Sequence, residues 1–451
     1  MPDPDDTLPA DYPTPEDILG DLSAFADDNP DICTIDKEGQ KSVEGKPIPV
    51  LRIQGPGATG PRVPFLVTGG VHAREWAPPL ALLRFCLKLL KRAAPKPDRT
   101  PREILYGSFE QFGLIHFPSV FIDRGAVSSI LANLDIYIVP LVNPDGYRFS
   151  RLDDRNKKWR KNRGSNGPLL PCEFQGLDQS VGTDINRNVD AGWHVEDYFD
   201  PNYYHTGAVH TAMDACGTFI PPFADPISGE TYRGLSPFSE PETKRVKQIV
   251  DDTQPQYFVD VHSFGPDLLY GWGFANNQSR DDTQNFLNAP KWDHKRDAGK
   301  GLSGHGAIYG EFVPAPLLSR SKLLGKRMAE NIKKMKTPDK EASDAVPGLG
   351  SDYPVKESTQ LYPSAGITDY LMQKNYGPAS GPDFHIATVP PARYPYTMEC
   401  GGPGQGEFRP RIDVQYLKVE REVHLALWSL MAFAASPAHR ATKGWPIRTG
   451  T

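Results

Sequence analysis

A histidine and a glutamate three residues apart, His72 and Glu75, are the first side chains of this chain whose types and spacing suggest metal chemistry. Neutral imidazole nitrogen and carboxylate oxygen both suit Zn²⁺ as ligands. The pair follows a strand-like run over 63–67 and precedes a helix-like run that opens with Pro78. Because proline suits the first turn of a helix, the pair is expected on the turn that follows a strand. That edge of an open α/β sheet is where ligands bind.

Taken alone, this pair is weak evidence for a site, because a chain with 11 histidines is expected to contain a chance H-x-x-E. A solvated surface pair is the more frequent origin of such a motif. Two further strand-like runs, however, end in the polar residues His262 and Glu399. A catalytic zinc ion needs three protein ligands and one open position for water. His72, Glu75 and His262 would supply the ligands, and Glu399 would be a free carboxylate able to take a proton from that water.

The elements expected to position these residues alternate along the chain. Strands are expected over 47–53, 63–67, 134–142, 257–261 and 397–399, and helices from 14, over 78–91, from 239, over 322–336 and over 414–433. Thr14 is a good N-cap, and Ser239 with Glu242 has the spacing of a capping box. The residues 143–147 have a turn signature. The alternation favours a single α/β domain: a mixed parallel/antiparallel twisted sheet of about eight strands, flanked by helices and carrying long loop insertions.

Composition and charge narrow the class of protein. The net charge is −6 with no sustained basic stripe, so nucleic acid is not expected as a partner. No apolar run reaches the ~18 residues needed to cross a membrane. The acidic amino terminus does not resemble a signal peptide, so we expect either a cytoplasmic protein or a secreted one whose leader was removed. We expect a monomer.

The five cysteines form no C-x-x-C pair, so neither a structural zinc site nor a redox motif is indicated. Cys172 and Cys216 lie in two loop-like segments and are candidates for a disulfide. If they pair, an oxidising compartment follows, and the secreted alternative is favoured.

Seven blocks of the sequence resemble the zinc metallocarboxypeptidases of the pancreatic carboxypeptidase A/B type, and they occur in that family's order. The blocks cover residues 70–76, 143–147, 158–163, 184–188, 261–263, 361–366 and 396–399. Together they are far more specific than a lone H-x-x-E, because chance would have to produce each one independently. The resemblance implies one zinc ion held by His72, Glu75 and His262. It also implies hydrolysis of the C-terminal peptide bond of peptides or proteins.

The resemblance assigns the chemical steps to two residues. Glu399 would be the general base that removes a proton from water and later delivers it to the leaving amine. Arg160 would stabilise the oxyanion of the tetrahedral intermediate, and losing such a donor typically costs ~10²–10³ in rate.

Substrate binding is assigned by the same resemblance to a further group. Asn186 and Arg187 would hold the terminal α-carboxylate, Arg187 through a two-pronged charge-assisted pair. An internal peptide bond has no such carboxylate, so the enzyme would act only at chain ends. Arg74, Ser263 and Tyr362 would help to position the substrate, with Tyr362 on a loop that can close.

Preference for the released residue is expected to depend on the floor of its pocket. Alignment of the motifs puts Thr368 there, where an acidic residue would select Lys or Arg; a tyrosine loop one residue shorter would put Ile367 there instead. Either floor is uncharged, so we expect release of apolar or aromatic C-terminal residues. Small neutral walls of this pocket are expected from Gly273, Ser364 and Thr397. Two acidic residues are expected nearby, Asp267 and Asp369, and either could reverse the preference.

The chain departs from the family's pattern in length. It is longer than the typical catalytic domain, and we expect insertions near 93–120, 194–227 and 274–350 to form a rim that restricts large protein substrates. The catalytic domain is expected over 14–436, between tails at 1–13 and 437–451. We expect no inhibitory pro-domain before residue 14, as in a mature or naturally pro-less form. Phe264 also stands where the family often has a tyrosine.

The sequence leaves three alternatives open. Singly, Arg160 and Arg187 are typical of surface ion pairs, and His262 of a core histidine. A zinc-binding scaffold that captures peptide C-termini without cleaving them would share the ligands. A hydrolase of the same fold could act on γ-linked, cell-wall or acylated substrates. A serine hydrolase is disfavoured because no G-x-S-x-G elbow occurs.

Overall fold

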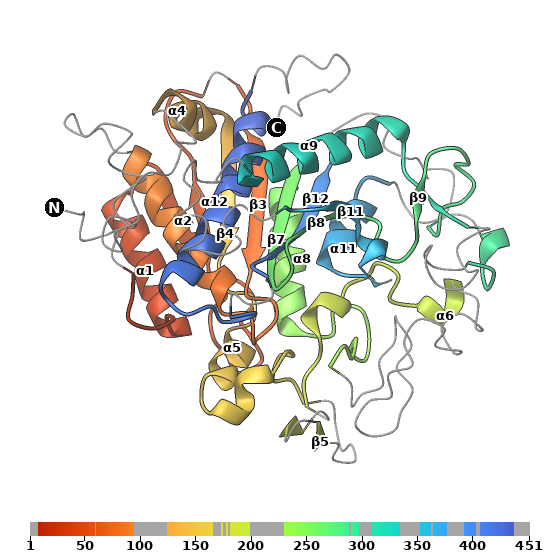
Figure 1. Ribbon diagram of the computed structural model, residues 1–451, viewed down its shortest axis with the longest axis horizontal. Coiled ribbons are helices and arrows are strands. Elements are labelled where there is room, and N and C mark those ends of the chain that lie inside the picture. Colours follow the sequence, from red (N-terminus) through yellow and green to blue (C-terminus); the bar gives the residue numbers. More distant parts are fainter. Residues whose placement is uncertain are drawn as a thin grey trace.

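An eight-stranded mixed sheet forms the centre of the molecule, in the order β1-β2-β4-β3-β7-β12-β8-β11 (Figure 1). Its strands are β1 (Cys33–Asp36), β2 (Val50–Ile53), β3 (Val63–Gly69), β4 (Leu134–Val139), β7 (Tyr257–Ser263), β8 (Asp267–Tyr270), β11 (Val355–Glu357) and β12 (Tyr394–Cys400). The computed structural model describes residues 8–58, 60–93, 124–165, 173–174, 177–178, 181–198, 230–287, 290–296, 309–333, 352–361, 364–376, 392–402 and 406–436. The predicted mixed α/β fold is confirmed.

Four neighbouring strands of this sheet, β4, β3, β7 and β12, run parallel to one another. Strand β2 joins β4 antiparallel, and β8 joins β12 antiparallel. The carboxyl ends of the four parallel strands therefore meet at one edge of the sheet, where ligands bind in open α/β folds. This is the edge at which the sequence places His72, His262 and Glu399.

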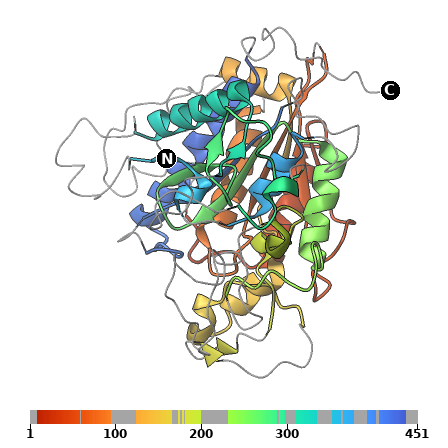
Figure 2. The same ribbon diagram turned by 90° about the vertical axis from the view of Figure 1, so that its right-hand side faces the viewer.

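Helices cover both faces of the sheet, and its central strand β7 is buried along its whole length. Figure 2 shows α9 and α12 on one side and α8 on the other. The helices on the first side are α1 (Pro15–Asp28), α2 (Ala77–Ala93), α4 (Arg124–Asn133), α9 (Ala315–Lys333) and α12 (Val414–Ala434), and those on the second are α8 (Pro241–Thr253) and α11 (Ile367–Gln373). Each face thus has its own apolar core.

The remaining elements are short. They are α5 (Pro144–Ser150), α6 (Val195–Tyr198), the 3₁₀ turns η2 (Asp154–Lys158), η3 (Ile185–Arg187), η4 (Pro290–Trp292) and η5 (Ser358–Gln360), and the strand pairs β5 (Glu173–Phe174) with β6 (Leu177–Asp178) and β9 (Asn277–Gln278) with β10 (Glu311–Phe312). Among the described residues, no helix is both long and apolar enough to cross a bilayer.

The helix starts follow local capping chemistry, with one correction. Thr14 Oγ1 accepts from Asp17 N at 3.1 Å and Asp17 Oδ2 accepts from Thr14 N at 2.9 Å, so the predicted start of α1 is confirmed as a capping box. The capping box predicted for Ser239 with Glu242 is wrong, because α8 begins one residue later and its N-cap is Glu240. Glu242 instead turns inward and accepts from Val43 N at 3.1 Å.

Two other boundaries differ from the sequence patterns for identifiable reasons. The predicted turn over 143–147 begins the helix α5, since Asn143 Oδ1 accepts from Gly146 N at 2.9 Å and caps it. Helix α9 begins at Ala315 rather than at 322, because the apolar residues Leu317 and Leu324 continue its buried face toward the amino terminus. The last helix, α12, lies where it was predicted.

The packing of α12 on α2 includes a buried ion cluster. Glu420 of α12 is 1% exposed, accepts from Arg84 Nε at 2.5 Å and also pairs with Lys88 Nζ. Burial alone raises the pKa of a carboxyl, but Lys88 and Arg84 hold the pKa of Glu420 well below its ordinary value of 4.5. The carboxylate therefore stays ionised inside the core, where two cations of α2 compensate it.

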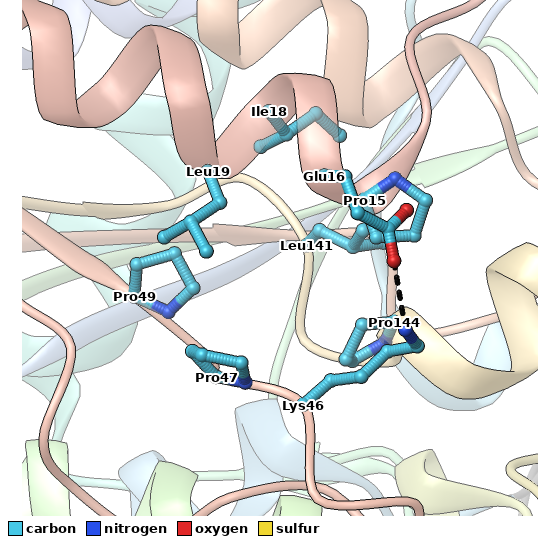
Figure 3. A pocket seen from close by; sticks show the side chains of 9 residues that line it. All are labelled: Pro15, Glu16, Ile18, Leu19, Lys46, Pro47, Pro49, Leu141 and Pro144. Carbon is cyan, nitrogen blue, oxygen red and sulfur yellow. Dashed lines mark hydrogen bonds and ion pairs between the residues drawn. The ribbon is translucent and has the colours of Figure 1, made fainter.

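A surface pocket of about 80 Å³ lies at the start of α1 (Figure 3). Its walls are mainly proline and leucine side chains, including Pro15, Leu19, Pro47, Pro49 and Pro144. A Glu16–Lys46 ion pair of 2.8 Å lies at its edge. It contains none of the predicted metal ligands, so the candidate site below is a different region.

Candidate functional site

The turn after β3 presents His72 and Glu75 because its backbone is unusually tight. Gly70 has φ +60°, and a Cβ there would lie 2.7 Å from Leu141 Cδ1 and 2.9 Å from Pro79 Cγ. Only glycine tolerates both conditions. The turn then begins α2, and Trp76 Nε1 donates to Ser150 Oγ at 2.9 Å, which anchors the residue after Glu75.

The three predicted metal ligands lie together and are all buried, with one donor atom from each within 4.8 Å of the others. His72 Nδ1 is 2.6 Å from Glu75 Oε1 and 3.1 Å from His262 Nδ1. His262 Nδ1 is also 3.1 Å from Glu75 Oε2. Donors that share one tetrahedral zinc ion at ~2.0–2.1 Å stand ~3.3 Å apart, so this set needs little movement to hold one.

Two aspartates to which the sequence analysis gave no role lie beside the histidines. Asp260 Oδ2 is 2.8 Å from His262 Nε2, and its other oxygen accepts from Thr68 Oγ1 at 2.6 Å. Asp184 Oδ1 is 3.4 Å from His72 Nε2. Carboxylates in this position fix the imidazole tautomer and leave the other nitrogen for a metal. Asp260 was recognisable in principle, because it is two residues before His262 on a strand and shares its face.

The electrostatics of these groups also suit a cation. Burial lowers the pKa of a histidine, yet Asp260 and Glu75 raise the pKa of His262 well above 6.5. Burial raises the pKa of a carboxyl, yet His72 and His262 hold the pKa of Glu75 well below 4.5. Negative charge is therefore in excess around the imidazoles, and a divalent cation between the donors would offset it. Two nitrogens and one carboxylate oxygen are the donor types that zinc prefers.

Glu399 lies beside His262 on the neighbouring strand, because β12 pairs with β7 in parallel with these two residues in register. Its burial raises its pKa to about 7, against the opposing effect of His262 and Arg160. A carboxyl whose pKa is near neutrality can both accept and donate a proton at neutral pH.

Arg160 and the 184–187 segment form the next layer of the site. Arg160 Nε donates to Asp184 Oδ2 at 2.9 Å, so Asp184 contacts both the predicted oxyanion donor and a predicted zinc ligand. Asp184 also caps η3 by accepting from Asn186 N at 2.9 Å. Asp184 therefore fixes the position of the segment that carries the predicted carboxylate-binding residues Asn186 and Arg187, relative to the predicted metal donors.

A close backbone approach holds Asn186 in place. Asn186 Oδ1 accepts from Ile367 N at 2.9 Å, and Asn186 Nδ2 lies 3.5 Å from His262 Nε2. A Cβ at Gly366 would stand 2.4 Å from Asn186 Oδ1, so any other residue there would displace the amide. Arg187 is 7% exposed and donates through Nη1 to the carbonyl of Asn186 at 2.8 Å.

The residues predicted for the side-chain pocket are brought together as well. Thr368 Oγ1 and Thr397 Oγ1 are 2.6 Å apart. Both nearby acids have partners of their own. Asp369 accepts from Gly273 N at 2.6 Å and from Gly366 N at 3.0 Å, and Asp267 pairs with Lys356 Nζ at 2.7 Å.

Ser263 and Arg74 contact their surroundings through different groups. The backbone N–H of Ser263 donates to Glu75 Oε2 at 3.1 Å, which holds the carboxylate toward the histidines. Arg74 lies between His72 and Glu75 on the same turn, and its guanidinium pairs with Glu230 Oε1 at 3.0 Å. Tyr362, Cys172 and Cys216 lie outside the described residues. The described cysteines Cys33, Cys86 and Cys400 are buried and unbonded to one another.

Known proteins resemble this chain in sequence and in fold. Carboxypeptidase B of Astacus astacus is 26% identical over 264 residues, which are 58% of this chain and 64% of the relative. Carboxypeptidase O of Bos taurus is 29% identical over 240 residues, 52% of this chain and 46% of the relative. The chain thus matches about half to two thirds of the length of these relatives.

Solved structures extend the similarity of the fold over nearly the whole chain. Carboxypeptidase A from Helicoverpa armigera superposes with a TM-score of 0.57 and 21% identity, over 97% of this chain and 75% of that one. The model of a protein family described as zinc carboxypeptidase matches residues 18–419. That range includes every described residue of the site, so the chain belongs to the zinc carboxypeptidase family.

Proposed function

We propose that this protein is a zinc-dependent exopeptidase that hydrolyses the C-terminal peptide bond of peptides or proteins. The convergence of His72, Glu75 and His262, with Glu399 in register beside His262, carries this proposal. Zinc held by the three donors would supply a Lewis acid that lowers the pKa of water toward ~7. Family membership supports the metal and the class of reaction.

The roles of the chain's own residues follow from their chemistry and placement. Glu399 would accept the proton of the attacking water and then protonate the departing amine, a task suited to its pKa of about 7. Arg160, oriented by Asp184, would donate to the oxyanion that forms at the scissile carbonyl. Asn186 and Arg187 would bind the terminal carboxylate, and this contact would confine cleavage to the last residue.

A test of this function compares a peptide with its C-terminal amide, before and after removal of metal. The free acid should be cleaved roughly 10- to 100-fold faster than the amide, because the amide loses charge-assisted hydrogen bonds to the clamp. Chelation should abolish cleavage of both, and one equivalent of zinc should restore it. Metal content should be measured on the same samples. Equal cleavage of acid and amide would remove the carboxylate clamp and favour a hydrolase with other substrates.

We propose further that the released residue is neutral and apolar or aromatic. The contact between Thr368 and Thr397 supports an uncharged pocket floor, and Ile367 in that position would be uncharged too. Asp369 accepts two backbone N–H groups and Asp267 pairs with Lys356, so both carboxylates have other partners. An Arg or Lys side chain would then be buried without a counter-charge, which is unfavourable.

Hydrolysis of hippuryl-Phe should therefore exceed that of hippuryl-Arg by at least about tenfold in kcat/KM. The two substrates share the scissile bond and the terminal carboxylate, so the ratio reports the pocket alone. Faster release of arginine would overturn the neutral preference and leave the exopeptidase proposal standing. In that case Thr368→Asp would be expected to change the ratio little.

A further inference from the structure

A second charged group lies at the metal-binding turn, and neither the ligand set nor the carboxylate clamp uses it. Arg74 Nη1 contacts both oxygens of Glu230, at 3.0 and 3.2 Å, and donates to the carbonyl of Lys158 at 3.2 Å. The Arg74 side chain is 14% exposed and that of Glu230 is 30% exposed. The cation is therefore largely covered, while part of the carboxylate faces solvent.

An aromatic pair surrounds this ion pair and links it to the donors. The Arg74 guanidinium lies over the Phe408 ring at 4.6 Å, and Phe408 packs edge-to-face on Phe264 at 4.9 Å. Phe264 follows the site residue Ser263, and the carbonyl of Phe408 accepts from Trp76 N at 3.1 Å. We call Arg74, Glu230, Phe264 and Phe408 the aromatic–ionic cluster. The cluster borders Ser263 and Trp76, which follow the predicted ligands His262 and Glu75 in the chain.

The aromatic–ionic cluster and the carboxylate clamp are built from different segments. The clamp residues Asn186 and Arg187 contact the 366–367 backbone and one another, whereas the Arg74 guanidinium contacts Glu230, Phe408 and the 158 carbonyl. A peptide whose last residue is bound by the clamp must extend away from the metal on another side of the site. There the aromatic–ionic cluster offers apolar rings and a charged edge for contact with the residues that precede the cleaved bond.

We propose that Glu230 is a specificity-determining residue that disfavours acidic side chains in the two substrate residues preceding the released one. This proposal rests on the exopeptidase function proposed above. Alone, Arg74 would attract an acidic side chain at this position. Glu230 neutralises that cation and adds an exposed carboxylate, so a substrate Glu or Asp meets a like charge. A neutral or basic side chain at the same position meets no such penalty.

The test uses two peptide sets that end in Phe, N-acetyl-Ala-Xaa-Phe and N-acetyl-Xaa-Ala-Phe, with Xaa as Glu, Gln or Lys. In at least one set the wild type should cleave the Gln peptide roughly two- to fivefold better than the Glu peptide in kcat/KM, as expected for a partly exposed charge pair. Glu230→Gln should remove that difference or reverse it. Glu16→Gln, which removes the exposed ion pair on α1, is the matched control and should leave the ratio as in the wild type.

Two further measurements keep the test independent of folding of the variant. In the wild type, raising salt from about 20 mM to about 500 mM should bring the Glu/Gln ratio toward unity, since exposed charges are screened. In an Arg74→Gln background, Glu230→Gln should no longer shift the Glu/Gln ratio of kcat/KM in favour of Glu peptides. The Arg74 guanidinium, which Glu230→Gln leaves without its partner, is absent from that background.

The outcomes separate the two proposals. If the zinc-loaded wild type cleaves neither these peptides nor their counterparts that end in Arg, the exopeptidase function is wrong, and the role of Glu230 in it fails as well. If peptides are cleaved but the wild type shows no discrimination against Glu in either set, or if Glu230→Gln leaves the ratio unchanged, the role of Glu230 is overturned and the exopeptidase function is not.

Discussion

Replacing Glu399 by glutamine is expected to lower kcat by about 10²–10⁴-fold, the usual contribution of a general acid–base residue. Glutamine preserves the size of the side chain and cannot accept the proton. KM should change little, because the role proposed for Glu399 is to act on the reacting water rather than on the bound substrate. Steady-state kinetics on hippuryl-Phe would measure both parameters.

The control for this variant is its metal content, which should equal that of the wild type because Glu399 is not among the three donors. Glu16→Gln again serves as a matched substitution on the surface. A Glu399→Gln protein as active as the wild type would exclude Glu399 as the base. A wild type that binds zinc and peptides without cleaving them would instead favour a scaffold that captures C-termini.

The second large effect concerns stability rather than catalysis. Glu420→Gln should lower the free energy of unfolding by about 3–5 kcal/mol, because it removes the counter-charge of two cations in the α2–α12 packing. The midpoint and slope of urea unfolding, followed by tryptophan fluorescence, would measure the loss. Glu16→Gln removes an exposed pair and should cost at most about 1 kcal/mol.

The same variant has an expected pH dependence with a definite sign. The pKa of Glu420 in the folded protein is well below the 4.5 of an unperturbed glutamate. Its contribution to stability is therefore fully present above 4.5 and is lost as the pH falls below that value. The difference between wild type and Glu420→Gln should shrink as the pH falls from about 5 to about 3. A difference that is constant over this interval would show that the carboxylate charge is not what stabilises the packing.

The ends of the central strands were predictable because they carry a local signal. His72, His262 and Glu399 each stand where an apolar, strand-like run meets a polar residue, and chain order plus the parallel rule is enough to bring such ends together. The seven motif blocks then indicated the roles. The eight-stranded sheet, the start of α1 and the bounds of α12 are confirmed for the same reason, since periodicity and capping residues are local.

What the sequence missed depends on contacts between distant segments. Ser239 has the spacing of an N-cap, yet its hydroxyl oxygen accepts a hydrogen bond of 2.8 Å from Asn188 Nδ2, 51 residues away. Glu230 meets Arg74 across 156 residues, and no motif joins them. Asp184 was part of a recognised block, but its contact with both His72 and Arg160 depends on the folded geometry. Such pairings have no periodic pattern along the chain.

The wide separation of the proposed zinc donors along the chain has a consequence for how the protein folds. His72 and His262 are 190 residues apart, and they meet only when β3 and β7 lie side by side. Metal affinity is therefore coupled to formation of the central sheet, and zinc binding should raise the melting temperature in proportion to the logarithm of free zinc. A fragment ending before β7 would retain the H-x-x-E turn and still lack a high-affinity site. Zinc uptake during refolding thus reports closure of the longest-range strand contacts, which are expected to form late.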